Sequence, residues 1–369
     1  MKKVLEVFGE PISRGGQESY VISALQNMDM SGLHIDMFTP YYCDNQLYIE
    51  YIQSIGGIIN HADLPFKVGG TRREIIPCFE QFLREHEKYD IVHIHSGSIS
   101  VLAYYARVAS KNGVSKIIVH SHSSGVKENF KHFMMKAYAA RIFKKYATDF
   151  CACSMEAAKW KFPKSVLPDV KILKNGVDLK KFKFNVDSRN EMRAFYGIEK
   201  DELVLGHVGR FTYEKNQAFL IDVLKEYISR FGSAKMVLVG DGVELEKVKD
   251  KAIKLGLENK VIFPGGQNNV NEFMNMFDIF LFPSLYEGLG IVGIEAQASG
   301  LHVIASTGVP ITINVSGNVK FCSLNSTEQW CEEIGKSKTK ERVDKYQTIK
   351  KNGFDIHDTS KEIRLMYFK

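Results

Sequence analysis

The sequence predicts an α/β protein with two Rossmann-like domains, each built around a buried parallel sheet. At roughly 150 residues per domain, a chain of 369 residues has room for two domains with separate cores. Hydrophobic residues make up 44% and charged residues 25%, which are globular proportions and exclude collagen-like and disordered proteins. Short apolar runs alternate with longer helix-like segments, a pattern typical of βαβ units.

Ten apolar runs are predicted as strands, five in each half: 4–8, 35–39, 91–95, 116–120 and 170–173, then 204–208, 235–239, 261–263, 279–282 and 302–305. The alternation pauses across 178–201, where charged residues replace the periodic apolar ones. We therefore predict an N-terminal domain over 1–178, a linker over 179–200 and a C-terminal domain over 201–345. The remaining segment, 346–369, is expected to be a helix that packs back on the N-terminal domain.

Charge and cysteine content narrow the class of protein. The net charge of +6 is too small for a dedicated nucleic-acid binder. The six cysteines contain no C-x-x-C pair, the first apolar stretch is too short for a signal peptide, and no apolar run is long enough to span a bilayer. These features predict a cytoplasmic protein with reduced thiols.

The most informative segment, 282–300, begins at the end of a predicted strand with the letters F-P-S-L-Y-E-G-L-G-I-V-G-I-E. Its glycine-rich turn precedes a helix expected to start near Gly290, and free backbone N–H groups at such a helix end suit a diphosphate. Two carboxylates, Glu287 and Glu295, bracket the turn. Both can accept hydrogen bonds from sugar hydroxyls.

Within this segment, residues 288–293 also match the dinucleotide fingerprint G-x-G-x-x-G. That fingerprint requires an acidic residue about 20 positions later to bind the ribose. Residues 296–327 contain no Asp or Glu, so a nicotinamide or flavin enzyme is rejected.

The fuller pattern, E-x7-E inside P-S-x-x-E-G-x-G…E-A-x-A-S-G, resembles the retaining glycosyltransferases of family 4, which have the GT-B fold. Other family motifs occur in the same order: G-G-Q-E at 15–18, N-G-V-D at 175–178, G-R…E-K-N across 209–216 and V-G-D-G at 239–242. The resemblance implies two Rossmann-like domains that face each other across a cleft. The N-terminal domain is then the acceptor side, and the C-terminal domain binds a nucleotide sugar.

Site residues follow from this resemblance together with residue chemistry. A guanidinium and an ammonium, Arg210 and Lys215, are suited to neutralising a leaving diphosphate. In the family these two positions contact the donor's diphosphate, Glu295 holds the ribose and Glu287 reaches the transferred sugar. The predicted donor site contains Gly15, Gly16, Arg210, Lys215, Gly288, Leu289, Gly290 and Glu295, and the predicted catalytic residues are His122, Arg210, Lys215 and Glu287.

Two histidine pairs, His93 with His95 and His120 with His122, lie at alternate strand positions, so each pair is expected on one face. Metal binding is the obvious hypothesis, but no third ligand is recognisable by spacing, and paired strand histidines are more often hydrogen-bonded in a core. The family carries a histidine near the transferred sugar at the position of His122. No metal ligands are predicted.

The segment 127–146 carries six cations and one acid, with apolar residues at helical spacing: Phe130, Phe133, Met134, Ala137, Tyr138 and Ile142. It fits either a membrane-surface helix or a core-packed helix with a solvated basic face. Similar enzymes dock on the inner leaflet through such a helix, which favours peripheral membrane contact.

The sequence therefore predicts a retaining hexosyltransferase that moves a sugar from a nucleoside diphosphate sugar to a saccharide acceptor. A lipid-linked acceptor in capsule or exopolysaccharide synthesis and a UDP-sugar donor are the commonest in such relatives, and GDP-mannose is the competing donor. No Asp-x-Asp motif occurs, so we expect neither a cofactor nor a required metal. Two alternatives are a nucleotide-sugar 2-epimerase and a non-catalytic sugar-nucleotide-binding subunit; the paired glutamates and the intact motif set argue against them.

Overall fold

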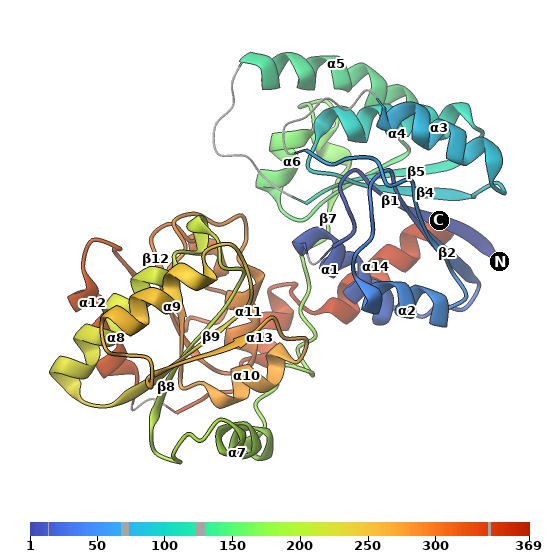
Figure 1. Cartoon of the computed structure of the whole chain (residues 1–369). Helices are drawn as coiled ribbons and strands as arrows, with labels where there is room; N and C mark the ends of the chain where they lie inside the picture. Colours follow the sequence, from blue (N-terminus) through green and yellow to red (C-terminus); the bar gives the residue numbers. More distant parts are fainter. Residues whose placement is uncertain (14, 68–73, 123–129, 339–340) are drawn as a thin grey trace. The chain divides into compact units, whose positions relative to one another are not determined.

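The structure is a computed structural model that describes residues 1–13, 15–67, 74–122, 130–338 and 341–369. The chain forms two compact units. The first contains Met1–Gly176 together with Ile356–Lys369, and the second contains Val177–Asp355. Each unit is an α/β domain with its own parallel sheet (Figure 1).

The first unit contains a seven-stranded sheet of order β3-β2-β1-β4-β5-β6-β7. Its strands are β1 (Lys2–Phe8), β2 (Leu33–Thr39), β3 (Ile59–His61), β4 (Ile91–His95), β5 (Lys116–Ser121), β6 (Asp149–Ala152) and β7 (Val170–Ile172). Its helices are α1 (Gly16–Gln26), α2 (Gln46–Ser54), α3 (Ile75–Glu85), α4 (Ile99–Lys111), α5 (Phe130–Tyr146), α6 (Met155–Lys161) and α14 (Ile356–Phe368).

Alternation along the strands gives the first sheet two different faces. Leu5 and Val7 of β1 belong to a core that includes buried residues of α3, α4, α5 and α6. Val4 and Phe8 point to the opposite face and pack with residues of α1 and α14. Glu6 shares this second face and is almost fully buried, so the α1/α14 side of the sheet carries a charged residue inside its core.

The second unit contains a six-stranded parallel sheet of order β10-β9-β8-β11-β12-β13. Its strands are β8 (Leu203–Val208), β9 (Ala234–Val239), β10 (Val261–Gly265), β11 (Ile279–Phe282), β12 (His302–Ser306) and β13 (Val319–Cys322). Its helices are α7 (Val186–Phe195), α8 (Gln217–Phe231), α9 (Leu245–Lys254), α10 (Val270–Met276), α11 (Ile291–Ala298), α12 (Thr327–Ser337) and α13 (Tyr346–Lys351).

Both strand orders reverse direction at one point, between β1 and β4 in the first unit and between β8 and β11 in the second. In open α/β sheets ligands bind outside the carboxyl ends of the strands at this switch point. The loops that follow β8 and β11 are therefore where the fold itself places a ligand site in the second unit.

All ten predicted strands are present, with boundaries that differ by at most two residues. Three strands were missed: Ile59–His61, Asp149–Ala152 and Val319–Cys322. The first and third are short strands at sheet edges, and the third carries an exposed residue, Lys320. Such strands lack the continuous apolar run that marks a buried strand.

The segment 179–200, predicted as a linker, contains α7 and lies inside the second unit. Leu179 and Phe182 are buried in that unit's core, and Arg193 of α7 donates to Asp278 at 2.7 Å. The C-terminal segment, predicted as one helix, forms two: α13 belongs to the second unit and α14 to the first. Of the predicted segment 346–369, residues 356–369 pack in the first unit, whereas 346–355 belong to the second.

Candidate active site

In the second unit the loops at the carboxyl ends of neighbouring strands are hydrogen-bonded to one another. The N–H of Gly209, just after β8, donates to the Val239 carbonyl at 2.9 Å. In the same loop, the Glu214 carbonyl accepts from the Leu285 N–H at 2.8 Å, which joins the β8 loop to the β11 loop. This backbone network fixes the two loops that carry the predicted cations and carboxylates.

Lys215 and Glu287 form an ion pair across the switch point. The Lys215 ammonium donates to Glu287 Oε1, and the Ser284 hydroxyl donates to the same oxygen at 3.1 Å. The two side chains are only 21% and 11% exposed, and the ammonium lies 5.8 Å from the centre of the Phe282 ring. The structure thus brings together two residues that are 72 positions apart in the sequence.

Arg210 precedes Lys215 by five residues in the same loop, and its side chain is exposed. Gln217 fixes its backbone by donating to the Arg210 carbonyl at 2.8 Å. No carboxylate among the described residues pairs with its guanidinium. An exposed, unpaired guanidinium beside a half-buried ammonium is a site that can bind two anionic groups.

Gly290 caps α11, as predicted, with φ of 74°, a left-handed conformation that favours glycine. A Cβ at this position would also lie 2.8 Å from the Phe282 ring. Gly293 allows α11 to approach β11 closely, because a Cβ there would meet Phe282 at 3.2 Å. By contrast, Gly288 is exposed with open space around it, and Leu289 packs partly against the core.

Glu295 lies in the second turn of α11 and is partly buried. Burial raises the pKa of Glu295 to about 7, against the opposing effect of the Lys181 charge. Its neutral form is thereby stabilised, and hydrogen bonds from hydroxyl groups would favour the carboxylate again. A carboxyl with a pKa shifted to near neutral pH, whose charge a ligand can therefore change, is typical of functional sites.

In the first unit, Gly15 and Gly16 lie at the start of α1, after β1. A Cβ on Gly15 would lie 2.0 Å from Glu18 Oε2, whereas one on Gly16 would meet nothing within 4 Å. The Glu18 carboxylate at the third helical position is a common helix cap. Gly15 leaves room for this carboxylate, and Gly16 is the more open of the two predicted donor contacts.

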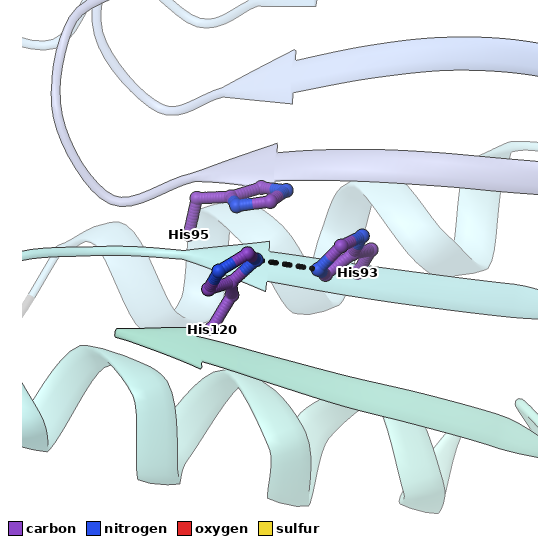
Figure 2. A group of neighbouring side chains, drawn as sticks. All are labelled: His93, His95 and His120. Atoms are coloured by element: carbon purple, nitrogen blue, oxygen red, sulfur yellow. Dashed lines mark hydrogen bonds between the residues drawn. The ribbon is translucent and has the colours of Figure 1, made fainter. Parts of the chain in front are cut away.

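His122 follows β5 directly, and its Nε2 lies 2.8 Å from His95 Nδ1. His95 Nε2 in turn lies 2.7 Å from Glu6 Oε2. Figure 2 shows His93, His95 and His120 pointing toward one another from β4 and β5, with His93 Nε2 3.2 Å from His120 Nδ1. The rings of each predicted pair therefore do share one face of the sheet.

A metal ion could in principle bind His93, His95 and His120, whose nearest ligand atoms lie within 4.8 Å of one another. Both nitrogens of His93 and of His95 are, however, already in hydrogen bonds: His93 with Tyr367 and His120, and His95 with Glu6 and His122. This arrangement agrees with the hydrogen-bonded core predicted from the sequence. A signal that the sequence analysis did not use is Glu6, an acid inside the apolar run 4–8.

The helix α5 differs from the expected amphipathic pattern, and residues 127–129 of the predicted segment lie outside the described residues. Ile142 was placed on one side with the other apolar residues, but it packs in the core beside Ala139 and Phe143. Phe130 and Phe133 are 78% and 59% exposed, and Met134, Ala137 and Tyr138 are exposed with them. The apolar stripe therefore faces outward, because the core side of the helix is a different stripe.

Comparison with known proteins gives the family. A sequence model described as "Glycosyl transferases group 1" matches residues 188–354, and one described as "Glycosyltransferase Family 4" matches residues 14–181. The Bacillus subtilis (strain 168) protein named "Putative glycosyltransferase EpsF" is 34% identical over 346 residues, which cover 91% of this chain and 88% of that protein. An Escherichia coli UDP-Gal:alpha-D-GlcNAc-diphosphoundecaprenol alpha-1,3-galactosyltransferase is 28% identical over 244 residues, 64% of this chain and 60% of that enzyme.

Solved structures show the same fold. Anabaena Alr3699/HepE in complex with UDP has a TM-score of 0.75 at 19% identity, covering 99% of this chain and 98% of its own. WaaG, a glycosyltransferase involved in lipopolysaccharide biosynthesis, has a TM-score of 0.71 at 18% identity, covering 97% and 98%.

The chain has two Rossmann-like domains, each with a parallel sheet, and it matches these solved glycosyltransferase structures over nearly its whole length. This is the GT-B fold. The chain belongs to glycosyltransferase family 4, which confirms the resemblance seen in the sequence. It is a glycosyltransferase that uses a nucleotide sugar.

Proposed function

We propose that this enzyme transfers a hexose from a UDP-sugar to a lipid-linked saccharide with retention of the anomeric configuration, in the synthesis of a cell-surface polysaccharide. The observation that carries the proposal is the arrangement of Arg210 and the Lys215–Glu287 pair at the switch point, beside the glycine-capped end of α11. Two cations and a helix end are complementary to a diphosphate, and a carboxylate is complementary to sugar hydroxyls.

The donor binds mainly to the second unit. Arg210, Lys215 and the backbone of residues 288–290 contact the diphosphate, and Glu295 accepts hydrogen bonds from the ribose. Glu287 is held by Lys215 and Ser284 and accepts from a hydroxyl of the transferred sugar. We assign to Gly16 and His122 of the first unit the roles that the family resemblance implies, binding of the donor phosphate and of the transferred sugar.

The chemistry is a substitution at the anomeric carbon. The bond from that carbon to the diphosphate oxygen breaks, and a bond to the acceptor oxygen forms on the same face. The acceptor's proton passes to the departing diphosphate. Arg210, Lys215 and the α11 end stabilise the negative charge that develops there, so neither an enzymatic nucleophile nor a metal ion is needed.

The choice of donor and acceptor draws on the relatives. The E. coli relative carries UDP-Gal and a diphosphoundecaprenol acceptor in its name, and HepE was crystallised with UDP and with UDP-glucose. The test is transfer from UDP-galactose, UDP-glucose and GDP-mannose to undecaprenyl-diphosphate-linked saccharides, with EDTA present. We expect an α-linked product from a UDP-sugar, at a rate that EDTA does not change. A β-linked product or a strict metal requirement would contradict the proposed mechanism.

Peripheral membrane contact through α5 is part of this proposal. No helix in the described ranges combines the length and the apolar character needed to cross a bilayer. The outward stripe of Phe130, Phe133, Met134 and Tyr138 is followed along α5 by the exposed cations Arg141, Lys144 and Lys145. Apolar side chains enter the acyl boundary while cations attract anionic lipid, each worth about 1 kcal/mol.

Co-sedimentation with phosphatidylglycerol vesicles tests this contact. A Phe133→Ser, Met134→Ser double variant should bind at least about tenfold more weakly, because burial of each side chain is worth roughly 1.5–3 kcal/mol. Phe195→Ser is the control, since Phe195 is an exposed aromatic residue on α7, outside α5. Equal binding by wild type and both variants would exclude α5 as the membrane contact.

A further inference from the structure

A buried polar cluster lies on the α1/α14 face of the first sheet, in the middle of an otherwise apolar core. Its members come from the three central strands and from α14: Glu6, His93, His95, His120, His122 and Tyr367. All except His122, which follows β5 and is partly exposed, are almost completely buried. Burial of this many polar groups is costly unless each is hydrogen-bonded, so the protonation of every ring nitrogen is constrained.

The direction of the hydrogen bonds can be followed from Glu6. Burial raises the pKa of this carboxyl, but His93 and His95 outweigh burial and hold the pKa well below its usual range. Glu6 is therefore ionised and can only accept, so His95 Nε2 donates to Glu6 Oε2 at 2.7 Å.

His95 is neutral near pH 7, because burial lowers its pKa to about 4, and the nearby His93 charge adds to this effect. With its proton on Nε2, Nδ1 is a lone pair that accepts from His122 Nε2 at 2.8 Å. Burial, with the charges of His95 and His93, also lowers the pKa of His122 well below its usual range, so this ring is neutral as well. The proton of His122 then lies on Nε2, and the unprotonated Nδ1 of the same ring can accept a hydrogen bond.

We propose that Glu6 and His95 are positioning residues, which hold His122 in the Nε2–H tautomer so that its Nδ1 can accept a hydrogen bond from a hydroxyl of the transferred sugar. The tautomer follows from two hydrogen bonds, one to an ionised Glu6 and one through a neutral His95, and the ligand rests on the proposed function. His122 Nδ1 is buried without a hydrogen-bond partner among the described residues, which is a cost that a donor from the substrate would remove.

A second branch of the cluster anchors Glu6 from the other side. The Tyr367 hydroxyl of α14 donates to Glu6 Oε1 and lies 2.9 Å from His93 Nδ1, and His93 Nε2 lies 3.2 Å from His120 Nδ1. This branch shares Glu6 with the first. Its His120 ring stacks on the His122 ring, with centroids 4.1 Å apart, but no hydrogen bond joins the two rings among the described residues, and Tyr367 lies at the other end of the branch. A change at Tyr367 is therefore a matched control for a change at His95.

The experiment is histidine NMR on the full-length protein with ¹⁵N-labelled histidine, in which long-range correlations identify the protonated nitrogen of each ring. His95→Asn keeps an amide oxygen near the position of Nδ1, whereas His95→Gln places its amide near Nε2 and removes the acceptor for His122. A His122→Gln variant assigns the His122 resonances. Tyr367→Phe is the control that leaves the His95–His122 bond in place.

We expect the His122 proton on Nε2 in the wild type, in His95→Asn and in Tyr367→Phe, and a mixture of tautomers in His95→Gln. A His122 proton on Nδ1 in the wild type would overturn the proposal, as would an unchanged tautomer in His95→Gln. So would a stoichiometric metal ion bound by His93 and His120 in the purified protein. If His95→Gln does not fold, the position of the His122 proton in the wild type alone tests the proposal.

Kinetics separate this proposal from the proposed function. In His95→Gln, kcat should fall at least about tenfold, the effect of one lost hydrogen bond to a reacting group, and His95→Asn should restore most of it. The dissociation constant for UDP should stay unchanged in both, because the second unit holds the nucleotide. A wild type that binds no nucleotide sugar would refute the proposed function while the tautomer result stands.

Discussion

At the scale of single residues, the proposed donor site combines paired and unpaired charges in the loops after β8 and β11. Lys215 is neutralised by Glu287 within the protein, whereas Arg210 is exposed and has no carboxylate partner among the described residues. A cation that lacks an internal partner can place its full charge on a ligand. We therefore expect a substitution of Arg210 to lower activity with little effect on stability.

Arg210→Ala should lower kcat/KM for the nucleotide sugar by about 10²–10³, because one charge-stabilising contact to the leaving group is lost. Its stability should change by less than about 0.5 kcal/mol, since the side chain is exposed. Steady-state transfer assays and urea unfolding measure the two effects. Unfolding at a much lower urea concentration would mean that Arg210 has a structural partner.

Glu295 predicts a pH dependence of stability. Its pKa is raised to about 7 from 4.5, so between these values the folded state binds a proton that the unfolded state has lost. Stability contributed by this group should therefore fall as the pH rises from about 4.5 to about 7 and stay constant above, by at most about 3 kcal/mol.

Glu295→Gln removes this titration. Relative to wild type, the variant should gain free energy of unfolding between pH 5 and pH 8, measured by urea denaturation at both values, and should bind UDP more weakly. An identical pH dependence in wild type and variant would show that Glu295 titrates normally.

At the scale of elements, the β11–α11 connection is the part of the site that was most predictable from sequence. Gly290, Glu287 and Glu295 form a local pattern, and the helix starts within one residue of its predicted position. The ion pair of Lys215 with Glu287 could not be predicted, because it depends on β8 and β11 being neighbours in the sheet although two strands separate them in sequence.

Gly290→Ala should destabilise the protein by about 1–3 kcal/mol, because Gly290 has φ of 74° and a Cβ would lie 2.8 Å from the Phe282 ring. It should also weaken UDP binding. Gly288→Ala is the matched control, since a Cβ at Gly288 meets nothing within 4 Å. Both are measured by urea unfolding, and equal effects would contradict this account of the turn.

Element prediction failed where contacts rather than pattern decide the structure. α7 has a polar sequence. It is held by Arg189 and Arg193, which donate to carbonyls at the end of α10 and just after it, and to the Asp278 carboxylate. Similarly, the edge strands β3 and β13 pair with one neighbour only. β3 is mostly polar, and Lys320 interrupts the apolar residues of β13. Neither arrangement leaves the hydrophobic periodicity on which sequence analysis depends.

At the scale of the whole molecule, the chain ends in the unit where it began. The helix α14 buries Ile356, Ile363, Met366 and Tyr367 in the core of the first unit, next to α1. The two-domain plan was predictable from the alternation of strands and helices. The return of the last helix was expected, but its partners, Glu6 and His93, required the three-dimensional structure.

Deletion of 356–369 should unfold the first unit and leave the second folded. Burial of four side chains at roughly 1.5–3 kcal/mol each contributes an amount similar to the roughly 5–15 kcal/mol of net stability of a domain. Hydrogen exchange should then show loss of protection in β1, β4 and β5 and retained protection in β8 and β11. Retained protection throughout would contradict the assignment of α14 to the first core.

The central claim is that the second unit binds the diphosphate of a UDP-sugar through Arg210 and Lys215. The most direct measurement is titration calorimetry of the wild type and of an Arg210→Ala, Lys215→Ala double variant with UDP, GDP, ADP and TDP. The account predicts one-to-one binding of UDP, at least about tenfold tighter than the others and weakened about 100-fold or more in the variant, since two charge-assisted contacts are lost. Binding of no nucleoside diphosphate by a cooperatively folded wild type, or equal affinity in the double variant, would contradict it.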